Sequence, residues 1–561
     1  MRLCRVAPPS RGALPDVSVT PSVPSPANLL PPVSRQVAAL LLFAALAAML
    51  VIHLLAIGGD FLSDDFVHAG WIADAQRAGE LPGWVLERFY RPIASGNYAY
   101  RPVVFASYAL DWVIYGNRAG GWHVTNLLIH VLNGALMLVL AWRLAARCGL
   151  PDARFTAVAA AALFLAIPFA GESTFWPVGR FDLLAVTFSL AFLILLIGRG
   201  RTWAMLACLL LALLSKESAM PMLVVGGALL FALALAEAAG PSPRARVLAA
   251  ARTTLARFWP VIVLALAYFA WRYALFGSPW KVYPDSRFPA SIGEAWARVS
   301  VLKHVFNHPY GDHAAAWLGL LAVASLAWLA GSRAALRRTT AAALLVAVTL
   351  AGCFMMYLLA PATSFAVAVA NGEGIRNLYF PWAMFSLLVA FVIGQHRLRV
   401  GFLCLGLVIA LWGQQRLVSL WQGTAAHMQH LTNAAPALAA TLDDSQYALL
   451  LLPDHIGAVP FVRNAQGGVV MPPRQAVSYL PKMAAMTPLQ FAEWEGHLAD
   501  NTIGKLKGPQ VVFAREAFAG VYCWVPLRGR FERLAAMPRA GQAKAWESAT
   551  MDEARRAGCL L

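Results

Sequence analysis

Two adjacent carboxylates, Asp64 and Asp65, are the residues of this sequence best suited to acid–base chemistry. They follow the first long apolar run by only a few positions, within the stretch 61–66. A carboxylate that faces water near a bilayer surface can accept a proton from an attacking hydroxyl group. The pair is therefore a candidate catalytic base, provided that basic groups from later loops reach the same place.

Further charged and polar residues border or interrupt the later apolar runs. A charge at the bilayer centre costs about 2.5 to 3.5 kcal/mol, so residues of this kind often mark function. Arginine can hold a phosphate group through two parallel hydrogen bonds, which lysine cannot. A structural ion pair at a helix end is the alternative for the cluster at 172–182. The candidates for contact with a substrate or a phosphate are Arg101, His123, Glu172, Arg180, Asp182, Lys216, Glu217, Glu373 and Arg376.

A polar stripe is formed by His123, Asn126, His130 and Asn133, which follow one another at intervals of three, four and three residues. This spacing aligns the four side chains along one face of a helix. The stripe is therefore predicted to face protein or water. Hydrogen bonds between packed helices are an equally good explanation for the two inner residues, and a weaker one for His123 at the outer end.

The elements that must position these residues are membrane helices. Apolar residues make up 59% of the 561 positions and charged residues 13%, with a mean hydropathy of +0.60, which excludes an ordinary soluble protein. A helix needs about 20 apolar residues to cross about 30 Å of hydrocarbon. We therefore predict a polytopic α-helical membrane protein with about eleven transmembrane helices. They are expected near 36–58, 122–142, 155–170, 181–198, 202–215, 218–237, 258–277, 314–331, 341–359, 377–394 and 400–417.

Arginine accumulates in alternate loops, which predicts that those loops are cytoplasmic. Threading the spans from a cytoplasmic N-terminus places the long first loop, 59–121, and the candidate site residues on the opposite face. Residues 1–35 are predicted to be a disordered cytoplasmic tail, and the apolar run that begins at Val37 a retained signal anchor. Topology and attraction to membrane lipids account for the net charge of +17, so no nucleic acid partner is predicted.

The last part of the chain, 418–561, has the composition of a soluble domain. Short β-like runs near 447–452, 510–514 and 521–525 alternate with helical stretches, which indicates a small α/β domain. The topology predicts that this domain is periplasmic, and the Ala-, Leu- and Arg-rich composition favours a bacterial inner membrane. Cys523 and Cys559 share this domain and could pair in an oxidising compartment.

One group of potential metal ligands lies at His304, His308, Asp312 and His313. The spacing of the first two suits a shared ion only if a helix persists as far as Pro309. A surface loop is the favoured interpretation, so no metal and no other cofactor is predicted.

Taken in order, the motifs resemble the GT-C superfamily of integral-membrane glycosyltransferases, especially its protein O-mannosyltransferase-like branch. The resemblance extends over about residues 36–395. It rests on the acidic pair, Tyr-Arg-Pro at 100–102, the stretch 122–133, the turn 172–182, Leu-Leu-Ser-Lys-Glu-Ser at 213–218 and Arg-x-Leu-Tyr-x-Pro at 376–381. It implies a sugar donor carried on polyprenyl phosphate.

The resemblance also assigns roles. It implies that Asp64 or Asp65 is the base, and it adds Tyr379 to the candidate substrate-binding residues. Phosphate contacts are implied for Arg101, Lys216 and Arg376.

The expected activity is transfer of the sugar to an acceptor on the periplasmic face, with inversion at the anomeric carbon. Side-chain cations would stabilise the departing phosphate, so a divalent metal is not required. The C-terminal domain, 418–561, lacks the helical repeats found in part of that branch, which leaves the acceptor open among glycan, lipid and protein. Phe169 and Ala170 stand where relatives tend to place a polar residue or His, which leaves the role of Glu172 open.

Two other classes of function fit parts of the pattern. A transporter or flippase for a lipid or a lipid-linked sugar would also place polar residues along helix faces. Its charges would be expected near the midplane, whereas those of this chain gather at one face. A non-catalytic assembly or sensor protein that binds through its tail is the third possibility.

Overall fold

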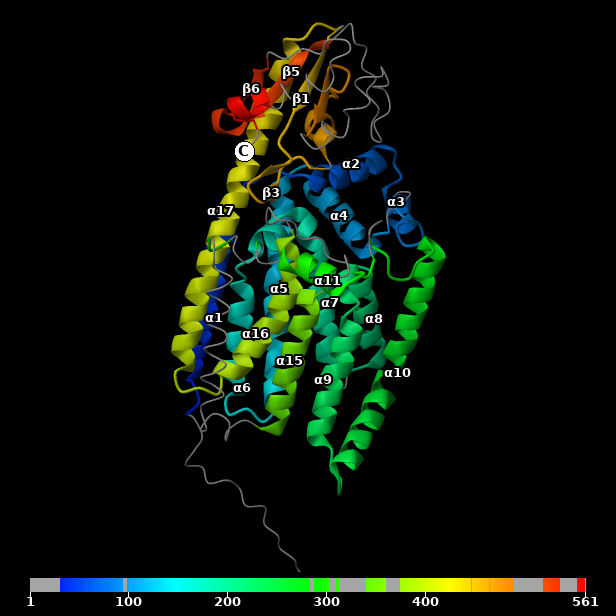
Figure 1. The fold of residues 1–561 in the computed structure, drawn as a ribbon, viewed down its shortest axis with the longest axis vertical. Helices are drawn as coiled ribbons and strands as arrows, with labels where there is room; N and C mark the ends of the chain where they lie inside the picture. The colour runs from blue at the N-terminus through cyan, green and yellow to red at the C-terminus, as the bar shows by residue number, and fades with distance from the viewer. Residues whose placement is uncertain are drawn as a thin grey trace, which may run out of the picture.

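The computed structural model describes residues 31–93, 98–198, 200–282, 287–301, 304, 309–311, 340–359, 374–444, 446–463, 465–487, 518–534 and 552–559. A bundle of long helices carries a smaller β-sheet unit at one end (Figure 1). Several sequence predictions concern residues outside the described ranges. They are most of the tail 1–35, Glu373, the span at 314–331, the strand at 510–514 and three of the four potential metal ligands.

The bundle contains α1 Arg35–Leu54, α5 Ala119–Arg147, α6 Ala153–Leu165, α7 Arg180–Ile197, α8 Thr202–Leu213, α9 Met222–Glu237, α10 Pro243–Phe276, α15 Ala341–Leu359, α16 Tyr379–Ile393 and α17 Arg399–Ala440. The first loop forms α2 Asp64–Arg77, α3 Leu81–Glu87 and α4 Pro102–Tyr115, which lie at the end of the bundle that faces the sheet (Figure 1). A further short helix, α11, spans Ile292–Ser300. We call the end that holds α2–α4 the loop end.

Eight helices among the described residues are long and apolar enough to cross a membrane. The chain is therefore polytopic, whereas the predicted number of about eleven spans is not confirmed. Two of the expected spans, α6 and α8, have only 13 and 12 residues. Pro168 follows α6 and α8 runs into the polar break at 215–217, so each helix ends early for a local reason.

Small residues let α6 pass through the middle of the bundle. Its run of alanines, 157 and 159–162, is buried on every side. Facing it on α5, Gly134 leaves space that a β-carbon would close, because that atom would lie 2.6 Å from a methyl carbon of Leu165. In a lipid bilayer the hydrophobic effect does not drive helices together, so membrane helices associate through close packing of this kind.

Helix α17 connects the bundle with the sheet. Its 42 residues correspond to a length of about 63 Å, roughly twice the hydrocarbon thickness. The expected span at 400–417 is only its first half, and the helix continues without interruption across position 418, the predicted start of the tail domain. Figure 1 shows the second half reaching beyond the loop end to the sheet.

The sheet has four strands in the order β4-β1-β5-β6, and a two-stranded hairpin lies apart from it. The main strands are β1 Tyr447–Leu451, β4 Met483–Met486, β5 Phe518–Val525 and β6 Arg530–Arg533. The hairpin pairs β2 His455–Ile456 with β3 Val459–Pro460. Strand β1 is parallel to β4 and β5, and β6 is antiparallel to β5. Two of the predicted β runs, near 447 and 521, are therefore strands.

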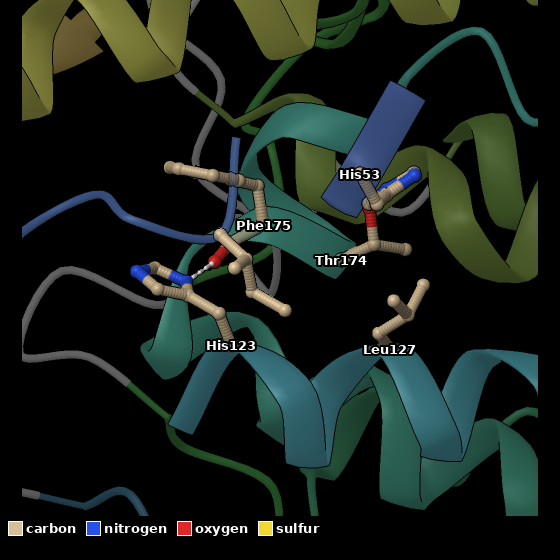
Figure 2. Close-up of a pocket in the computed structure, with 6 residues that line it drawn as sticks. His53, His123, Leu127, Thr174 and Phe175 are labelled. Carbon is tan, nitrogen blue, oxygen red and sulfur yellow. Dashed lines mark hydrogen bonds between the residues drawn. The ribbon is translucent and has the colours of Figure 1, made fainter. Parts of the chain in front are cut away.

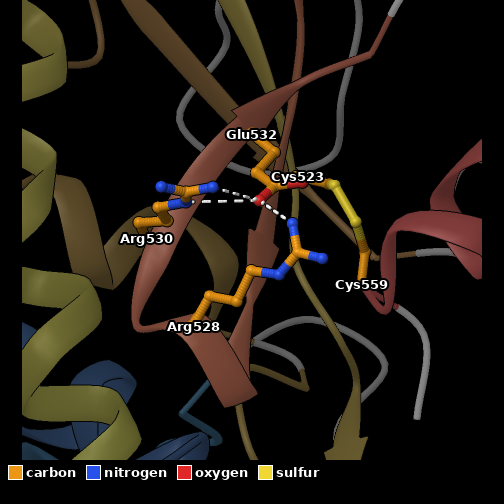
Figure 3. The surroundings of a disulfide bond; sticks show 5 residues. All are labelled: Cys523, Arg528, Arg530, Glu532 and Cys559. Atoms are coloured by element: carbon orange, nitrogen blue, oxygen red, sulfur yellow. Dashed lines mark hydrogen bonds and ion pairs between the residues drawn. A yellow bond between two sulfur atoms is a disulfide. The ribbon is translucent and has the colours of Figure 1, made fainter.

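A disulfide joins Cys523 on β5 to Cys559 near the C-terminus, with the two Cα atoms 5.8 Å apart (Figure 3). The pairing that the sequence allowed is therefore present. Beside it, Glu532 accepts hydrogen bonds from Arg528 and Arg530 at 2.5 Å and 3.0 Å.

We predict that Cys559→Ser lowers the free energy of unfolding of the sheet unit by about 2–4 kcal/mol, because the crosslink restricts the unfolded chain. Thermal unfolding in detergent, monitored by near-UV circular dichroism, measures the change. Cys404→Ser, which removes an exposed free thiol, is the control. Equal unfolding curves for both variants would contradict a structural role for the bond.

Candidate functional site

A sharp turn between α6 and α7 is the scaffold of the site. It consists of a π-helical turn, η2 Gly171–Phe175, and a 3₁₀ turn, η3 Pro177–Gly179. Both glycines are required by close approach, because a β-carbon on Gly171 would lie 2.2 Å from Nε1 of Trp421 and one on Gly179 would lie 2.1 Å from the carbonyl oxygen of Glu172. The turn therefore fixes the positions of the charged residues that it carries.

The acidic pair begins α2, and its two members differ in environment. Asp65 is buried, and its two carboxylate oxygens accept hydrogen bonds from the backbone N–H groups of Leu62 and Val178 at 3.0 Å and 3.1 Å. This carboxylate thereby joins the first loop to the turn before α7. Asp64 is only half-buried, so its carboxylate is the more accessible to a substrate.

Burial raises the pKa of the Asp65 carboxyl group well above its ordinary value. The two backbone donors and Arg180 oppose this shift, and the charge of Asp64 adds to it.

Glu172 binds the segment that precedes α16. One of its oxygens accepts a hydrogen bond from the backbone N–H of Gly374 at 2.9 Å, and the other accepts from Nη1 of Arg376 at 2.9 Å. Gly374 has φ +102°, a conformation that glycine adopts without strain. The Arg376 guanidinium lies 5.5 Å from the ring centre of Trp176, and its side chain is 17% exposed. This pair reaches the surface of the site through its arginine.

Lys216 and Asp182 form a second pair. The ammonium group donates to both carboxylate oxygens, at 2.6 Å and 2.7 Å, and both side chains are buried. Asp182 lies in the first turn of α7, where the helix dipole favours a negative charge. Lys216 comes from the polar break after α8, so this contact fastens the break to the start of α7.

Glu217 forms the centre of a third group. Its carboxylate accepts from the backbone N–H of Tyr100 at 2.6 Å and from Nε of Arg101 at 3.1 Å. Arg272 of α10 approaches the same carboxylate to 3.7 Å. The Arg101 guanidinium also lies 4.4 Å from the ring centre of Phe181. One carboxylate, in the break after α8, therefore binds residues of the first loop and of α10.

Arg180 is fully buried and holds α4, α5 and α7 together. It donates to Oδ2 of Asp111 at 2.5 Å, to Oδ1 of Asn126 at 2.8 Å and to the hydroxyl of Ser107 at 3.1 Å. Its guanidinium also lies over the ring of Tyr108 at 5.1 Å. With its donors occupied in this way, Arg180 lies among structural partners and not at an accessible surface.

The polar stripe of α5 makes hydrogen bonds with neighbouring segments, the alternative that the sequence left open. Asn126 donates to the carbonyl of Trp176 at 2.8 Å, and Asn133 donates to that of Leu183 at 3.0 Å. His130 accepts from the hydroxyl of Tyr379 at 2.7 Å. Tyr379 is completely buried, so it contacts the stripe and not an open site.

His123 occupies the outer end of the stripe beside a small pocket. Its Nδ1 donates to the carbonyl oxygen of Phe175 at 2.5 Å, as Figure 2 shows, while Nε2 has no hydrogen-bond partner among the described residues. His53 of α1 lies across the pocket and bonds the Thr174 hydroxyl at 2.8 Å. The pocket is lined by His53, Ile57, His123, Leu127, Thr174 and Phe175.

Two histidines near the site were missed in the sequence. His68 lies one turn after the acidic pair, with ring centres of Phe105, Tyr108 and Phe181 at 5.4 Å, 5.5 Å and 5.8 Å. Burial lowers the pKa of His68 to about 3, and the charge of Arg101 acts in the same direction. His68 could have been found from its spacing of three and four residues from the acidic pair on a helix.

The second is His455 of the C-terminal hairpin. Burial lowers the pKa of His455, and the carboxylates of Asp454 and Glu172 oppose this change. It comes from a segment that carries no motif, so no sequence signal pointed to it.

Besides the buried pair of Arg180 with Asp111, the described residues around the start of α7 include three cation–carboxylate pairs and one half-buried carboxylate, Asp64. The pairs are Arg376 with Glu172, Lys216 with Asp182 and Arg101 with Glu217. Cations that are already positioned can stabilise an anionic leaving group, and a nearby carboxylate can take up a proton. No group of three or more potential metal ligands occurs in the part of the chain that the structure describes. Among the potential ligands at 304–313, only His304 belongs to that part.

Two crystal structures of ArnT from Cupriavidus metallidurans are similar to this chain, one bound to undecaprenyl phosphate and one in the apo state. Each has 14% sequence identity and a TM-score of 0.31. The first match covers 81% of this chain and 90% of that chain, and the second 82% and 92%. No protein family and no curated protein matches the sequence.

The raised pKa of Asp65 predicts how stability depends on pH. The folded protein holds this proton more tightly than the unfolded chain. The contribution of protonated Asp65 to the free energy of unfolding is therefore complete below about pH 4 and is lost as the pH rises through the folded pKa. Between pH 4 and 8, the melting temperature of the wild type should therefore fall relative to that of Asp65→Asn. The exposed carboxylate variant Asp74→Asn is the control and should follow the wild type. Parallel curves for wild type and Asp65→Asn would contradict the shift.

Arg180→Met should destabilise the protein by about 3–5 kcal/mol, because it leaves the buried Asp111 carboxylate without its cation and removes the hydrogen bonds to Asn126 and Ser107. Urea unfolding followed by tryptophan fluorescence measures the loss. Arg77→Met removes an exposed ion pair with Asp74 and should change stability by less than about 0.5 kcal/mol. Similar effects of the two substitutions would show that Arg180 is not a structural centre.

Proposed function

We propose that this protein is a membrane glycosyltransferase of the GT-C type, which transfers a sugar from a polyprenyl-phosphate carrier to an acceptor hydroxyl. The observation that carries the proposal is a half-buried carboxylate, Asp64, at the start of a helix that Asp65 fastens to the turn before α7, where three cation–carboxylate pairs also lie. The ordered motifs between 36 and 395 support the same class.

Asp64 is the better candidate for the base. A base must reach the proton that it removes. Both oxygens of Asp65 already accept backbone hydrogen bonds inside the protein, whereas Asp64 is half-buried at the start of the helix. We therefore assign proton transfer to Asp64 and the placement of the helix start to Asp65.

The proposed reaction is a direct displacement. Asp64 takes the proton of the acceptor hydroxyl, and the oxygen of that hydroxyl forms a bond to the anomeric carbon of the sugar. The bond between that carbon and the phosphate oxygen breaks, and its electron pair leaves with the polyprenyl phosphate. One displacement inverts the configuration at the anomeric carbon.

Arg376 and Arg101 are the candidates for contact with the departing phosphate. Their side chains are 17% and 11% exposed, whereas Lys216 is 7% exposed. Each is held by a glutamate, so the guanidinium groups are oriented before the substrate arrives. An oriented cation does not need to reorganise as charge develops on the leaving group.

The loop end is proposed to face the periplasm of a bacterial inner membrane. Every second loop between the predicted spans is rich in arginine, and the positive-inside rule assigns these loops to the cytoplasm. The first loop and the sheet then lie on the periplasmic side. A disulfide in the sheet unit suits that compartment.

Transfer of radiolabelled sugar from polyprenyl-phosphate sugars to an envelope extract by purified protein tests the function. Asp64→Asn should lower the rate by about 10²- to 10⁴-fold, the usual contribution of a general base. Asp74→Asn, on the exposed face of the same helix, should retain the wild-type rate. The configuration of the product, determined by NMR, should be inverted.

The other outcomes distinguish the alternatives. Loss of transfer in Asp65→Asn alone would identify Asp65 as the base. Full activity of both Asp64→Asn and Asp65→Asn would exclude a first-loop carboxylate as the base. If no donor is used while proteoliposomes move a lipid-linked sugar across the bilayer, the protein is a flippase.

A further inference from the structure

The C-terminal domain contacts the turn that presents the acidic pair. The backbone N–H of Ser63 donates to the carbonyl of Phe461 at 2.8 Å, and the Ser63 hydroxyl donates to the carbonyl of Arg463 at 2.6 Å. These partners are 398 and 400 positions away in the sequence and directly follow the β2–β3 hairpin. The residue immediately before Asp64 is therefore held by the C-terminal domain.

Ser63 has an unusual backbone conformation. With φ 48° and ψ −123°, it is the only residue other than glycine with a positive φ in the described ranges. Such a conformation costs on the order of 1–3 kcal/mol and persists only where surrounding contacts impose it. The two bonds to Phe461 and Arg463 are contacts of this kind.

The hydroxyl of Ser63 is also diverted from its usual task. Ser63 occupies the N-cap position of α2, where a serine normally accepts a hydrogen bond from the first turn of the helix. No such bond forms, because this side chain is turned to the carbonyl of Arg463. The start of the helix is stabilised instead by Asp65, which accepts from the N–H of Leu62.

Two further contacts join the same segments. Asp60 forms an ion pair with Arg474, which also donates to the Thr432 hydroxyl of α17 at 3.0 Å. In the short helix η7 Gln466–Val470, Gly468 packs so closely on Phe66 that a β-carbon would lie 2.6 Å from the β-carbon of Phe66. The C-terminal domain thus touches the first loop at Asp60 and Ser63, before the acidic pair, and at Phe66, directly after it.

We infer that residues 461–463 and 465–474 of the C-terminal domain set the orientation of the catalytic carboxylate, and that Ser63 and Gly468 are positioning residues. The tail is then a working part of the transferase site. This inference rests on the proposed function, because it assigns a role relative to Asp64. A misplacement of about 1 Å can reduce a rate about 10²-fold, so loss of the contacts should act on turnover.

The test compares kcat and the KM for the polyprenyl-phosphate sugar in Ser63→Ala, Ser63→Gly and Gly468→Ala. Gly468→Ala should lower kcat about 10²-fold with the KM for the donor nearly unchanged, because the donor contacts remain. Ser63→Gly keeps a backbone that tolerates positive φ but loses the hydroxyl, so its loss should be smaller than that of Ser63→Ala. Gly423→Ala on α17 is the matched control, since nothing lies within 4 Å of its added carbon.

Hydrogen exchange at the amides of 61–66 provides a readout that is independent of activity. Exchange should become faster in Ser63→Ala and Gly468→Ala and stay unchanged in Gly423→Ala. If the wild type transfers sugar and both variants keep their kcat, or lose it without faster exchange, the inference is wrong and the proposed function stands. If the wild type transfers no sugar, the proposed function fails and the role assigned to the tail falls with it. Should Gly468→Ala fail to fold, Ser63→Ala carries the comparison.

Discussion

Burial of ionised side chains between apolar helices is the constraint on which the arrangement of the site depends. A single charge removed from water is strongly unfavourable, whereas a charge with a hydrogen-bonded partner is tolerated. Arg180 meets Asp111, Lys216 meets Asp182 and Glu172 meets Arg376, each across different elements of the bundle. The pairs thereby specify which helix ends lie together, and removing one member would leave the other as an unpaired buried charge.

The turn before α7 is where these pairs converge. The turn runs between Pro168 and Arg180 and includes two glycines. Neighbouring atoms leave no room for a β-carbon at either glycine. The turn also offers the backbone N–H of Val178 to Asp65, and the indole of Trp176 donates to the carbonyl of Leu62 at 3.1 Å. One rigid turn therefore positions both the buried ion pairs and the helix that carries the carboxylates. Activity of such a site would depend on packing far from the reacting atoms.

The carboxylates of the first loop are shaped by contacts from two directions. From the bundle, Val178 occupies one oxygen of Asp65, which makes this member of the pair a structural link. From the tail, Phe461 and Arg463 hold Ser63 in a conformation that it would not adopt alone. Asp64 lies between these two attachments. The difference in burial between these two identical neighbouring side chains thus arises from their surroundings and not from their chemistry.

The sequence by itself determined the membrane class and the segments that carry charge. These properties follow from composition, apolar run length and local breakers such as Pro168, which act over a few residues. The breaks at 172–182 and 215–217 were recognisable for the same reason. The length of α17 was not, because its second half is polar enough to be taken for a soluble domain.

Only the tertiary structure decided which charges are partners. Arg101 meets Glu217 across 116 positions, Glu172 meets Arg376 across 204, and Ser63 meets Arg463 across 400. Spacing along one helix cannot encode such contacts, since they depend on how separate helices pack. The same packing separates Asp64 from Asp65 in burial, and it brings His455 to a site that no local pattern assigned to it.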